Sequence, residues 1–565
     1  MIKKIASILL LVIAIAVVDG CTKLKEKVLD EASVAGLTDK QQAEGIISPV
    51  YAKLEDVFLH TNYFALQEIS TDEAILPFRG GTDWGDNGIY IQLHKHENIS
   101  SDVNVKNTWN NILIGVSRAV TAINALPTNS YADSKIFLAE ARGMRAYYSM
   151  LMLDLYGLIF VKEDASETSK ILRGQEAIDY IKSEFLAVEP VLDNTVGPGR
   201  LTKAAVWGLL ARLHLNSAVY RDVYASSFNF KSEDMDKVIE YCDKIINSNQ
   251  YSLSTDYFSL FNDNNHTNKE LIFAVDQRAD LGNGHNRMAY FSLSGDQFPL
   301  PAYPAANGTD GPAITPEFYR SWVNAYAPVD PAAADPRFYK QNLFIPSDSC
   351  VPKANFNIDR GILRGQQYGL LRPSGAFVPC GTNGLKVGKL FNTTRAGSSG
   401  VPVNFTEQID FTTAGSGYST GYRVSKYEFS KTSTSGRNLG EHDIVILRLA
   451  DVYLMRAEAK LRKGGADASA LADVNFVRAS RTATSSTAPP AALPSINLDL
   501  LFRERGFEFY WECQRRTDMI RFGKYEGTWT EKTSTDKQKR LFPIPSTAID
   551  AASNLPGYLV QNPGY

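Results

Sequence analysis

The amino-acid sequence predicts a mostly α-helical protein with a long irregular region in its middle. Apolar residues recur at every third or fourth position over about residues 40–260 and again over 441–565, which is the period of amphipathic helices. Between them, over about 260–440, Asn, Gly, Ser, Thr and Pro predominate and indicate long loops with short strands. Because long loops in compact proteins are often functional, we expect the ligand site in this loop-rich region.

Three helices are expected in the first part. Residues 137–156 carry one apolar stripe, and Gly157 after them is a typical helix end. Residues 203–219 follow Thr202, a suitable N-cap, and residues 238–246 form a third amphipathic stretch. Such helix pairs resemble tetratricopeptide units, although no fixed repeat length is present.

Helices return after residue 440, and the last of them has a pattern that could suggest catalysis. Residues 501–514 place Glu504, Glu508 and Glu512 on one helix face. A glycosidase needs two carboxylates that face each other across a sugar, whereas neighbours on one face point in parallel. Arginines are interleaved with these glutamates at positions 503, 505, 515 and 516. An ion-pair network is therefore the favoured interpretation, and no catalytic residue is predicted.

Several classes of function are disfavoured by composition. The formal net charge is -3 over 565 residues and the basic residues form no stripe, which argues against a nucleic-acid partner. No phosphate-binding or dinucleotide-binding loop is present, so no cofactor is expected. His94 and His96 could bind a metal, but no third ligand of matching spacing exists, and a structural role is favoured.

The N-terminus predicts export and lipid anchoring. Residues 1–20 read as a signal peptide, with Lys3 and Lys4 ahead of an apolar stretch too short to span a bilayer. Cys21 follows directly and is expected to carry the lipid; a plain secretory signal is the alternative. A disulfide between Cys350 and Cys380 is a further hypothesis, since both lie in the loop-rich region of an exported protein.

One glycine-rich stretch, residues 72–90, holds groups suited to a saccharide. Sugar C–H faces pack on an indole ring, and planar carboxylate, amide and guanidinium groups bind vicinal hydroxyls. The alternative is that Trp84 fills the core and Arg79 pairs with Asp72. The predicted ligand residues are Asp72, Arg79, Trp84, Asp86 and Asn87, with Tyr290, Phe291 and Trp322 as further candidates from the irregular region.

Motifs in five parts of the chain resemble those of the RagB/SusD family. They occur in the family's order and span nearly the whole chain after residue 21. The motifs are STDE at 70–73, AEAR at 139–142, RLADVYLMRAEA at 448–459, RERGFEF at 503–509 and LFPIP at 541–545, before the ending QNPGY.

The resemblance implies a single domain over 21–565 and a non-enzymatic role in nutrient uptake. It implies a lipoprotein of the outer membrane, facing outside, that binds oligosaccharide and delivers it to a SusC-like TonB-dependent transporter. Three alternatives stay open: a peptide ligand in a similar complex, a secreted glycoside hydrolase, and a structural lid for the transporter without a ligand of its own.

Overall fold

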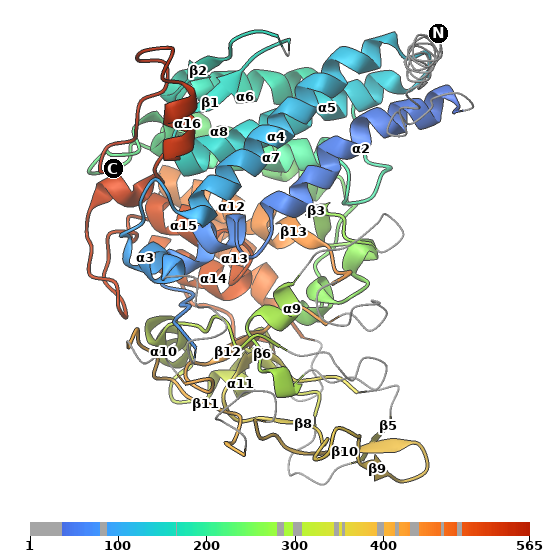
Figure 1. The fold of residues 1–565 in the computed structure, drawn as a ribbon, viewed down its shortest axis with the longest axis vertical. Coiled ribbons are helices and arrows are strands. Elements are labelled where there is room, and N and C mark those ends of the chain that lie inside the picture. Colours follow the sequence, from blue (N-terminus) through green and yellow to red (C-terminus); the bar gives the residue numbers. More distant parts are fainter. Residues whose placement is uncertain are drawn as a thin grey trace, which may run out of the picture.

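Helices form one half of the molecule and short strands the other (Figure 1). The prediction of a mostly α fold with an irregular region is confirmed. No helix within the described ranges is long and apolar enough to cross a membrane. The computed structural model describes residues 37–79, 88–164, 166–278, 287–297, 308–343, 350–352, 356–392, 400–412, 417–429, 440–464, 468–482 and 489–565.

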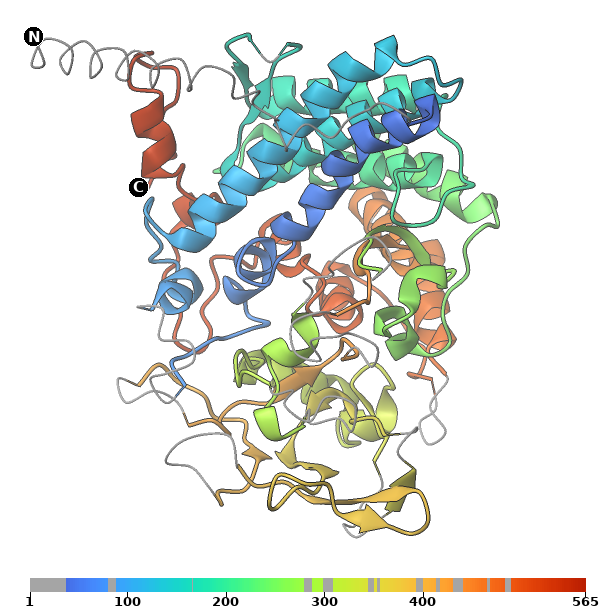
Figure 2. The ribbon, with the colours of Figure 1, turned by 45° about the vertical axis from the view of Figure 1, so that its right-hand side comes forward.

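The helical half is built from neighbouring helices that pack in sequence order. Helix α4 packs on α5, α5 on α6, and α7 on α8, while α2 lies against α4 and α5, as Figure 2 shows. This stacking buries the apolar face of each helix on its neighbour, as in helical repeats. The helices are α2 (Asp39–Val57), α3 (Ile89–Lys95), α4 (Val103–Ala125), α5 (Ser134–Tyr156), α6 (Gly174–Val188), α7 (Lys203–Arg221) and α8 (Ser232–Asn247).

The predicted ends of two helices are confirmed. Helix α5 stops at Gly157, whose φ of 71° lies in the left-handed region that favours glycine. A side chain there would also strike Leu541, because an added Cβ would overlap its Cδ1 atom. Helix α7 begins after Thr202, whose hydroxyl accepts a hydrogen bond from the Ala205 amide at 3.1 Å.

The C-terminal helices pack on the first group, with α12 against α7 and α8. Both ends of one helix differ from the prediction: α14 begins at Leu498 instead of residue 501, and it ends at Phe509 instead of continuing to Gln514. Trp511 and Cys513 both have a φ of 60°, which a right-handed helix does not allow. The helices are α12 (Leu449–Gly464), α13 (Ala468–Ser480), α14 (Leu498–Phe509), α15 (Arg515–Arg521) and α16 (Ser546–Ala551).

A two-stranded antiparallel sheet joins the chain before and after the irregular region. Strand β3 (Leu271–Val275) pairs with β13 (Ile444–Arg448), and every residue of both strands is buried. The hairpin of β1 (Ile159–Val161) and β2 (Lys170–Leu172) lies at the far edge of the helical half. The β3–β13 pair therefore fixes where the irregular region leaves and re-enters the helical scaffold.

Among its described residues, the irregular half combines short strands with three α-helices. A second apolar core lies here, around Leu363, Leu385 and Val387. The helices are α9 (Met288–Phe291), α10 (Pro316–Tyr326) and α11 (Pro331–Ala334). The strands are β4 (Tyr339–Lys340), β5 (Cys350–Pro352), β6 (Arg360–Leu363), β7 (Gly365–Gln366), β8 (Tyr368–Leu370), β9 (Pro379–Cys380), β10 (Gly384–Lys389), β11 (Asn404–Phe405) and β12 (Arg423–Ser425).

Cys350 and Cys380, the two cysteines expected to pair, form a disulfide in the structure. Their Cα atoms are 5.6 Å apart, within the usual range for this bond. Both cysteines lie beside β10, because Cys350 opposes Lys386 and Cys380 opposes Gly384. The bond thus joins β5 to β9 at the end of the molecule farthest from the helices (Figure 1).

Candidate functional site

The segment predicted to bind a ligand begins at a tight turn next to the C-terminal helices. Asp72 accepts two hydrogen bonds from the Arg515 guanidinium, at 2.7 and 2.8 Å. Its side chain keeps 21% of its surface exposed. Ile75 then pairs with Ala313 as an isolated β-bridge, which ties the segment to the irregular half. Asp72 is therefore held by an ion pair at the rim of this junction.

Arg79 is fully buried, and it does not pair with Asp72. Its guanidinium donates to the carbonyl oxygens of Gly311 at 2.6 Å, Gly417 at 3.0 Å and Thr420 at 2.9 Å. Both earlier interpretations of Arg79 need correction, since its partner is not Asp72 and its buried side chain cannot face a ligand. It anchors the start of the glycine-rich stretch on two loops of the irregular half.

Four of the predicted ligand residues stay predictions. Trp84, Asp86 and Asn87 lie outside the described residues, as does the anchor Cys21. Tyr290 belongs to α9, and its side chain is also outside the described part of the structure.

Phe291 and Trp322 are core residues, which corrects their assignment as ligand contacts. Phe291 is 1% exposed and Trp322 is fully buried. Trp322 stacks on Phe507 with ring centroids 3.7 Å apart, and the ring of Phe291 lies edge-on to His60 and Phe64. The aromatic content of the sequence does not distinguish aromatic residues of the core from those of a binding surface.

His94 and His96 have the structural role favoured from the sequence, and they lie at the end of α3. His94 Nδ1 lies 3.0 Å from the carbonyl oxygen of Ile69, and Nε2 lies 2.9 Å from that of Thr530. His96 Nε2 lies 2.8 Å from the Ser70 carbonyl oxygen. The two rings hold α3 against the turn that contains Asp72.

Glu504, Glu508 and Glu512 form the ion-pair network expected from the sequence, but with different arginines. Glu508 binds Arg337, Arg448 and Arg481 at 3.0, 2.7 and 2.5 Å. Three of the arginines interleaved with them in the sequence bind other carboxylates. Arg505 binds Asp451 and Asp518, Arg515 binds Asp72, and Arg516 binds Asp154. The three carboxylates are fully buried or nearly so and held by cations, which leaves them unsuited to acid catalysis.

A second pair of buried carboxyl groups was not predicted from the sequence. Glu68 lies in the π-helical turn Ala65–Ile69 and Glu73 in the turn after it. Burial raises the pKa of Glu73 to about 7, and burial together with the Glu73 charge raises the pKa of Glu68 well above its ordinary value. The two carboxyl groups act on each other in this buried place, which favours the protonated form of one of them.

This pair predicts a pH-dependent stability difference. A carboxyl with a raised folded-state pKa binds more protons folded than unfolded, so stability falls as pH rises from about 4.5 through about 7. Glu68→Gln keeps the shape of the side chain without needing a proton. Its free energy of unfolding relative to wild type should rise between pH 5 and 8, at up to about 1.4 kcal/mol per pH unit. Urea unfolding at several pH values measures this, with Glu240→Gln as an exposed control. A constant difference across pH contradicts the raised pKa of this pair.

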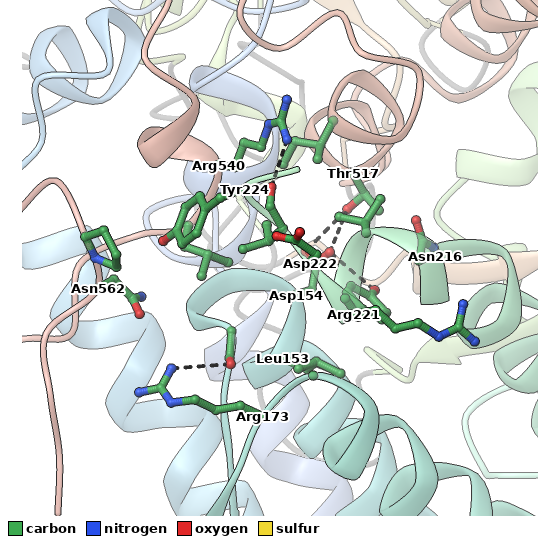
Figure 3. Close-up of a pocket in the computed structure, with 18 residues that line it drawn as sticks. Leu153, Asp154, Arg173, Asn216, Arg221, Asp222, Tyr224, Thr517, Arg540 and Asn562 are labelled. Carbon is green, nitrogen blue, oxygen red and sulfur yellow. Dashed lines mark hydrogen bonds between the residues drawn. The ribbon is translucent and has the colours of Figure 1, made fainter. Parts of the chain in front are cut away.

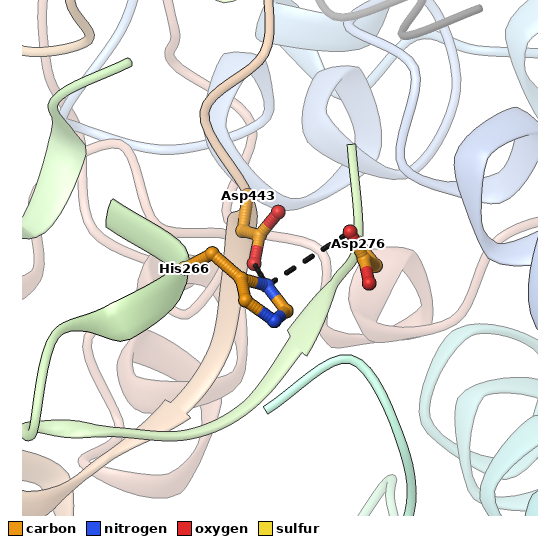
Figure 4. Close-up of side chains that lie close together, drawn as sticks. All are labelled: His266, Asp276 and Asp443. Atoms are coloured by element: carbon orange, nitrogen blue, oxygen red, sulfur yellow. Dashed lines mark hydrogen bonds and ion pairs between the residues drawn. The ribbon is translucent and has the colours of Figure 1, made fainter. Parts of the chain in front are cut away.

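Three residues that could together hold a metal ion meet beside the β3–β13 pair (Figure 4). His266 Nδ1 lies 2.6 Å from an Asp443 carboxylate oxygen and 3.9 Å from one of Asp276. The hydrogen bond to Asp443 raises the pKa of His266. These are donor types that divalent cations accept. The prediction that no metal site is present did not take these three residues into account, because they become neighbours only when β3 pairs with β13.

Two cavities, described below with their volumes, lie away from the predicted ligand residues that the structure describes. One, of about 360 Å³, lies between α5, α7, α15 and the C-terminal segment (Figure 3). The other, of about 480 Å³, lies between α2 and the loops that carry Arg200 and Arg278, with His266 and Asp276 in its wall. None of the predicted ligand residues that the structure describes lines either cavity.

Comparisons with known proteins agree on one family. The model of the SusD family matches residues 248–565. The starch-binding protein SusD of Bacteroides thetaiotaomicron is 27% identical over 450 residues, which cover 76% of this chain and 72% of that protein.

Solved structures show the same fold. A SusD superfamily protein from Parabacteroides distasonis superposes with a TM-score of 0.66 at 19% identity, covering 94% of this chain and 100% of that one. Surface glycan-binding protein A from Bacteroides thetaiotaomicron, in complex with laminarihexaose, superposes with a TM-score of 0.62 at 18% identity, covering 92% of this chain and 99% of that one.

Proposed function

The chain belongs to the SusD family, and from this premise we propose that it binds an oligosaccharide at the cell surface and delivers it to a SusC-like TonB-dependent transporter. The observation that carries the proposal is the family match over 248–565, together with relatives named for binding starch and laminarin. The proposed role is binding without catalysis, so the ligand is released chemically unchanged.

The state of the buried carboxylates supports a binding role without catalysis. A glycosidase needs an acid and a second carboxylate on opposite sides of the bound sugar. Glu504, Glu508 and Glu512 are locked to buried cations. Glu68 and Glu73 have raised pKa values, but both are 1% exposed or less, so a sugar cannot reach them.

The proposed glycan site is the stretch between Arg79 and α3, which carries Trp84, Asp86 and Asn87, with Tyr290 as a further contact. Support comes from the way both ends of the stretch are fixed. Arg79 binds three backbone carbonyls at one end, and His94 and its neighbours hold α3 at the other. The described residues on both sides of the stretch are thus held by hydrogen bonds.

Trp84→Ala should remove about 1–3 kcal/mol of oligosaccharide affinity, by analogy with ring stacking on aromatic side chains. Its free energy of unfolding should change little, because a surface aromatic contributes little to folding. A glycan and peptide array with the protein lacking residues 1–21 first identifies the ligand, starting from starch and laminarin fragments. Calorimetric titration and a thermal melt of the variant then give both quantities.

The opposite pattern contradicts the site. If Trp84 fills the core, its removal should cost about 3–5 kcal/mol of stability and leave the affinity of the folded molecule unchanged. If the protein binds peptides but no glycans on the same array, its ligand belongs to the peptide class. The assignment to the family is unaffected by that result.

The membrane attachment is tested at Cys21. Cys21→Ala should release the protein from the membrane fraction, because the diacylated cysteine is its proposed anchor. Radiolabelled palmitate should enter the wild-type protein and not the variant. Absence of label from the wild type would leave only the secretory signal.

A further inference from the structure

Three side chains from separate segments lie beside the β3–β13 pair with their donor atoms close together (Figure 4). His266 belongs to the turn Asn265–Thr267, Asp276 follows the last residue of β3, and Asp443 precedes the first residue of β13. One atom from each of them lies within 4.8 Å of the other two. The group therefore lies where the irregular region leaves and re-enters the helical scaffold.

The spacing of these atoms is close to that of metal ligands. Bonds from zinc to nitrogen and oxygen are about 2.0–2.2 Å long, so neighbouring ligands of a tetrahedral ion lie about 3.4 Å apart. From Nδ1 of His266, an Asp443 oxygen lies at 2.6 Å and an Asp276 oxygen at 3.9 Å. One separation is shorter and the other longer than the ligand spacing, so small side-chain rotations bring all three atoms around one ion. The Nδ1 proton, which His266 now donates to Asp443, passes to solvent when the ion binds.

The Asp443 carboxylate is oriented by the backbone around it. Its Oδ1 accepts from the Gln277 amide at 2.9 Å, and its Oδ2 is the oxygen that faces His266. The Asp443 amide donates to the side-chain oxygen of Asn265 at 2.8 Å. Such outer contacts hold the ligands of a metal in place. Because Asp443 is fully buried, a bound cation would also compensate its lost hydration.

The group opens on the cavity of about 480 Å³, which gives an ion a way in and supplies water for its remaining coordination positions. The side chains of His266 and Asp276 line this cavity and are 19% and 15% exposed. Two further carboxylates, Glu44 and Glu55, line the same cavity. They add to the negative charge that attracts a cation.

Two arginines also line the cavity, and both are paired with carboxylates. Arg200 binds Glu140, which is not a member of the group. Arg278 donates to the two oxygens of Asp276 at 3.0 and 2.8 Å. The Arg278 side chain is 42% exposed, so solvent screens its charge from an ion nearby. Arg278 is thus compatible with a bound ion, as an outer partner that orients the Asp276 carboxylate.

The loop that carries Gly197 and Gly199 confines two of the three side chains from the other side. A Cβ added at Gly199 would lie 2.7 Å from Oδ2 of Asp276, and one added at Gly197 would lie 3.1 Å from Nε2 of His266. Both distances are shorter than ordinary contacts, so a side chain at either position would push against one of the candidate ligands. Nε2 of His266 therefore faces this loop, while its Nδ1 faces the two carboxylates.

We propose that His266, Asp276 and Asp443 bind a Zn²⁺ ion, with water from the cavity completing its coordination shell. The imidazole nitrogen favours zinc over calcium and magnesium, which prefer oxygen ligands. The ion would link the turn at 265–267 to both strands and hold the irregular region on the scaffold. This structural role is independent of the proposed glycan binding, because the zinc site shares no residue with the stretch that carries Trp84.

Zinc titration tests the site on chelator-treated protein that lacks residues 1–21 and carries no histidine tag. Calorimetry should show one Zn²⁺ per chain, bound at least about tenfold more tightly than Ca²⁺ or Mg²⁺. His266→Gln and Asp276→Asn should each weaken zinc at least about tenfold, since the loss of even an outer partner costs about 10- to 100-fold. Asp234→Asn is the matched control. Asp234 pairs with His214 at 3.0 Å, but among the described residues this pair belongs to no group of three ligands.

A second measurement shows whether the ion acts at the junction. Added zinc should raise the melting temperature of the wild-type protein and slow hydrogen exchange at the amides of β3 and β13. Neither change should occur in Asp276→Asn. A melt of each variant without zinc confirms that the folded protein is being measured.

Several results would overturn the zinc site. They are no zinc bound by the wild-type protein in excess ZnCl₂, calcium or magnesium bound as tightly as zinc, or an equal loss of affinity in Asp234→Asn. Unchanged zinc affinity in both His266→Gln and Asp276→Asn would place the ion elsewhere. Zinc that binds without slowing exchange in β3 and β13 would contradict the proposed link between the strands.

Discussion

Replacing Glu508 by alanine is expected to lower the free energy of unfolding by about 3–5 kcal/mol, the usual cost of breaking a buried ion pair from one side. Glu508 is fully buried and binds three arginines. Burial raises the pKa of its carboxyl, but the three guanidinium groups outweigh that effect and hold the pKa well below its ordinary value. Without the carboxylate, those cations lose their common counter-charge in a place that water does not reach.

Urea unfolding at neutral pH measures this cost, and two other variants serve as comparisons. Glu240→Ala removes an exposed partner of Lys237 and should change stability by about 1 kcal/mol or less. Glu508→Gln keeps the shape but loses the charge, so it should be nearly as unstable as the alanine variant. If the glutamine variant matches wild type, hydrogen bonding rather than charge holds the arginines.

Trp322→Ala is the second change with a large expected effect, about 3–5 kcal/mol of lost stability. Trp322 is fully buried, stacks on Phe507 and packs edge-on against Phe338. Its removal leaves a cavity between α10 and α14 that neighbouring side chains cannot close. Chemical unfolding gives the stability, and calorimetric titration gives the oligosaccharide affinity of the folded variant.

Affinity separates this outcome from the original assignment of Trp322 as a ligand contact. The folded Trp322→Ala protein should bind oligosaccharide as wild type does. Trp322→Phe is the conservative comparison, since it keeps a ring against Phe507 and should recover most of the stability. Loss of affinity with full stability in the alanine variant would restore the ligand role.

The regular helices could be predicted because their signals are local. The apolar stripe of α5, its stop at Gly157 and the Thr202 cap of α7 each depend on residues within one turn. The end of α14 could not be read in this way. The sequence stays compatible with a helix through Gln514. In the structure, the left-handed turns at Trp511 and Cys513 let the amide of Trp511 donate to Glu73 and the amide of Gln514 donate to Glu68.

The candidate site depended on long-range contacts and was predicted less well. Asp72 and Arg79 lie close in sequence and looked like partners, but each binds a group more than two hundred residues away. The Glu68–Glu73 pair and the His266 group have the same cause, since a sequence shows charges without showing which of them become buried together. Phe291 and Trp322 were misassigned because an aromatic side chain suits a core and a sugar equally well.

The pairing of β3 with β13 has a consequence for how such proteins can diversify. The irregular region leaves and returns through adjacent strands, so its two ends are already closed by the scaffold. Lengthening a loop with fixed ends costs little, about 0.6 kcal/mol for each doubling. Relatives could therefore exchange whole irregular regions while the helical scaffold stays the same. A functional chimera would need to keep cations at the positions of Arg337 and Lys426, because Glu504, Glu508 and Glu512 in the recipient scaffold bind them.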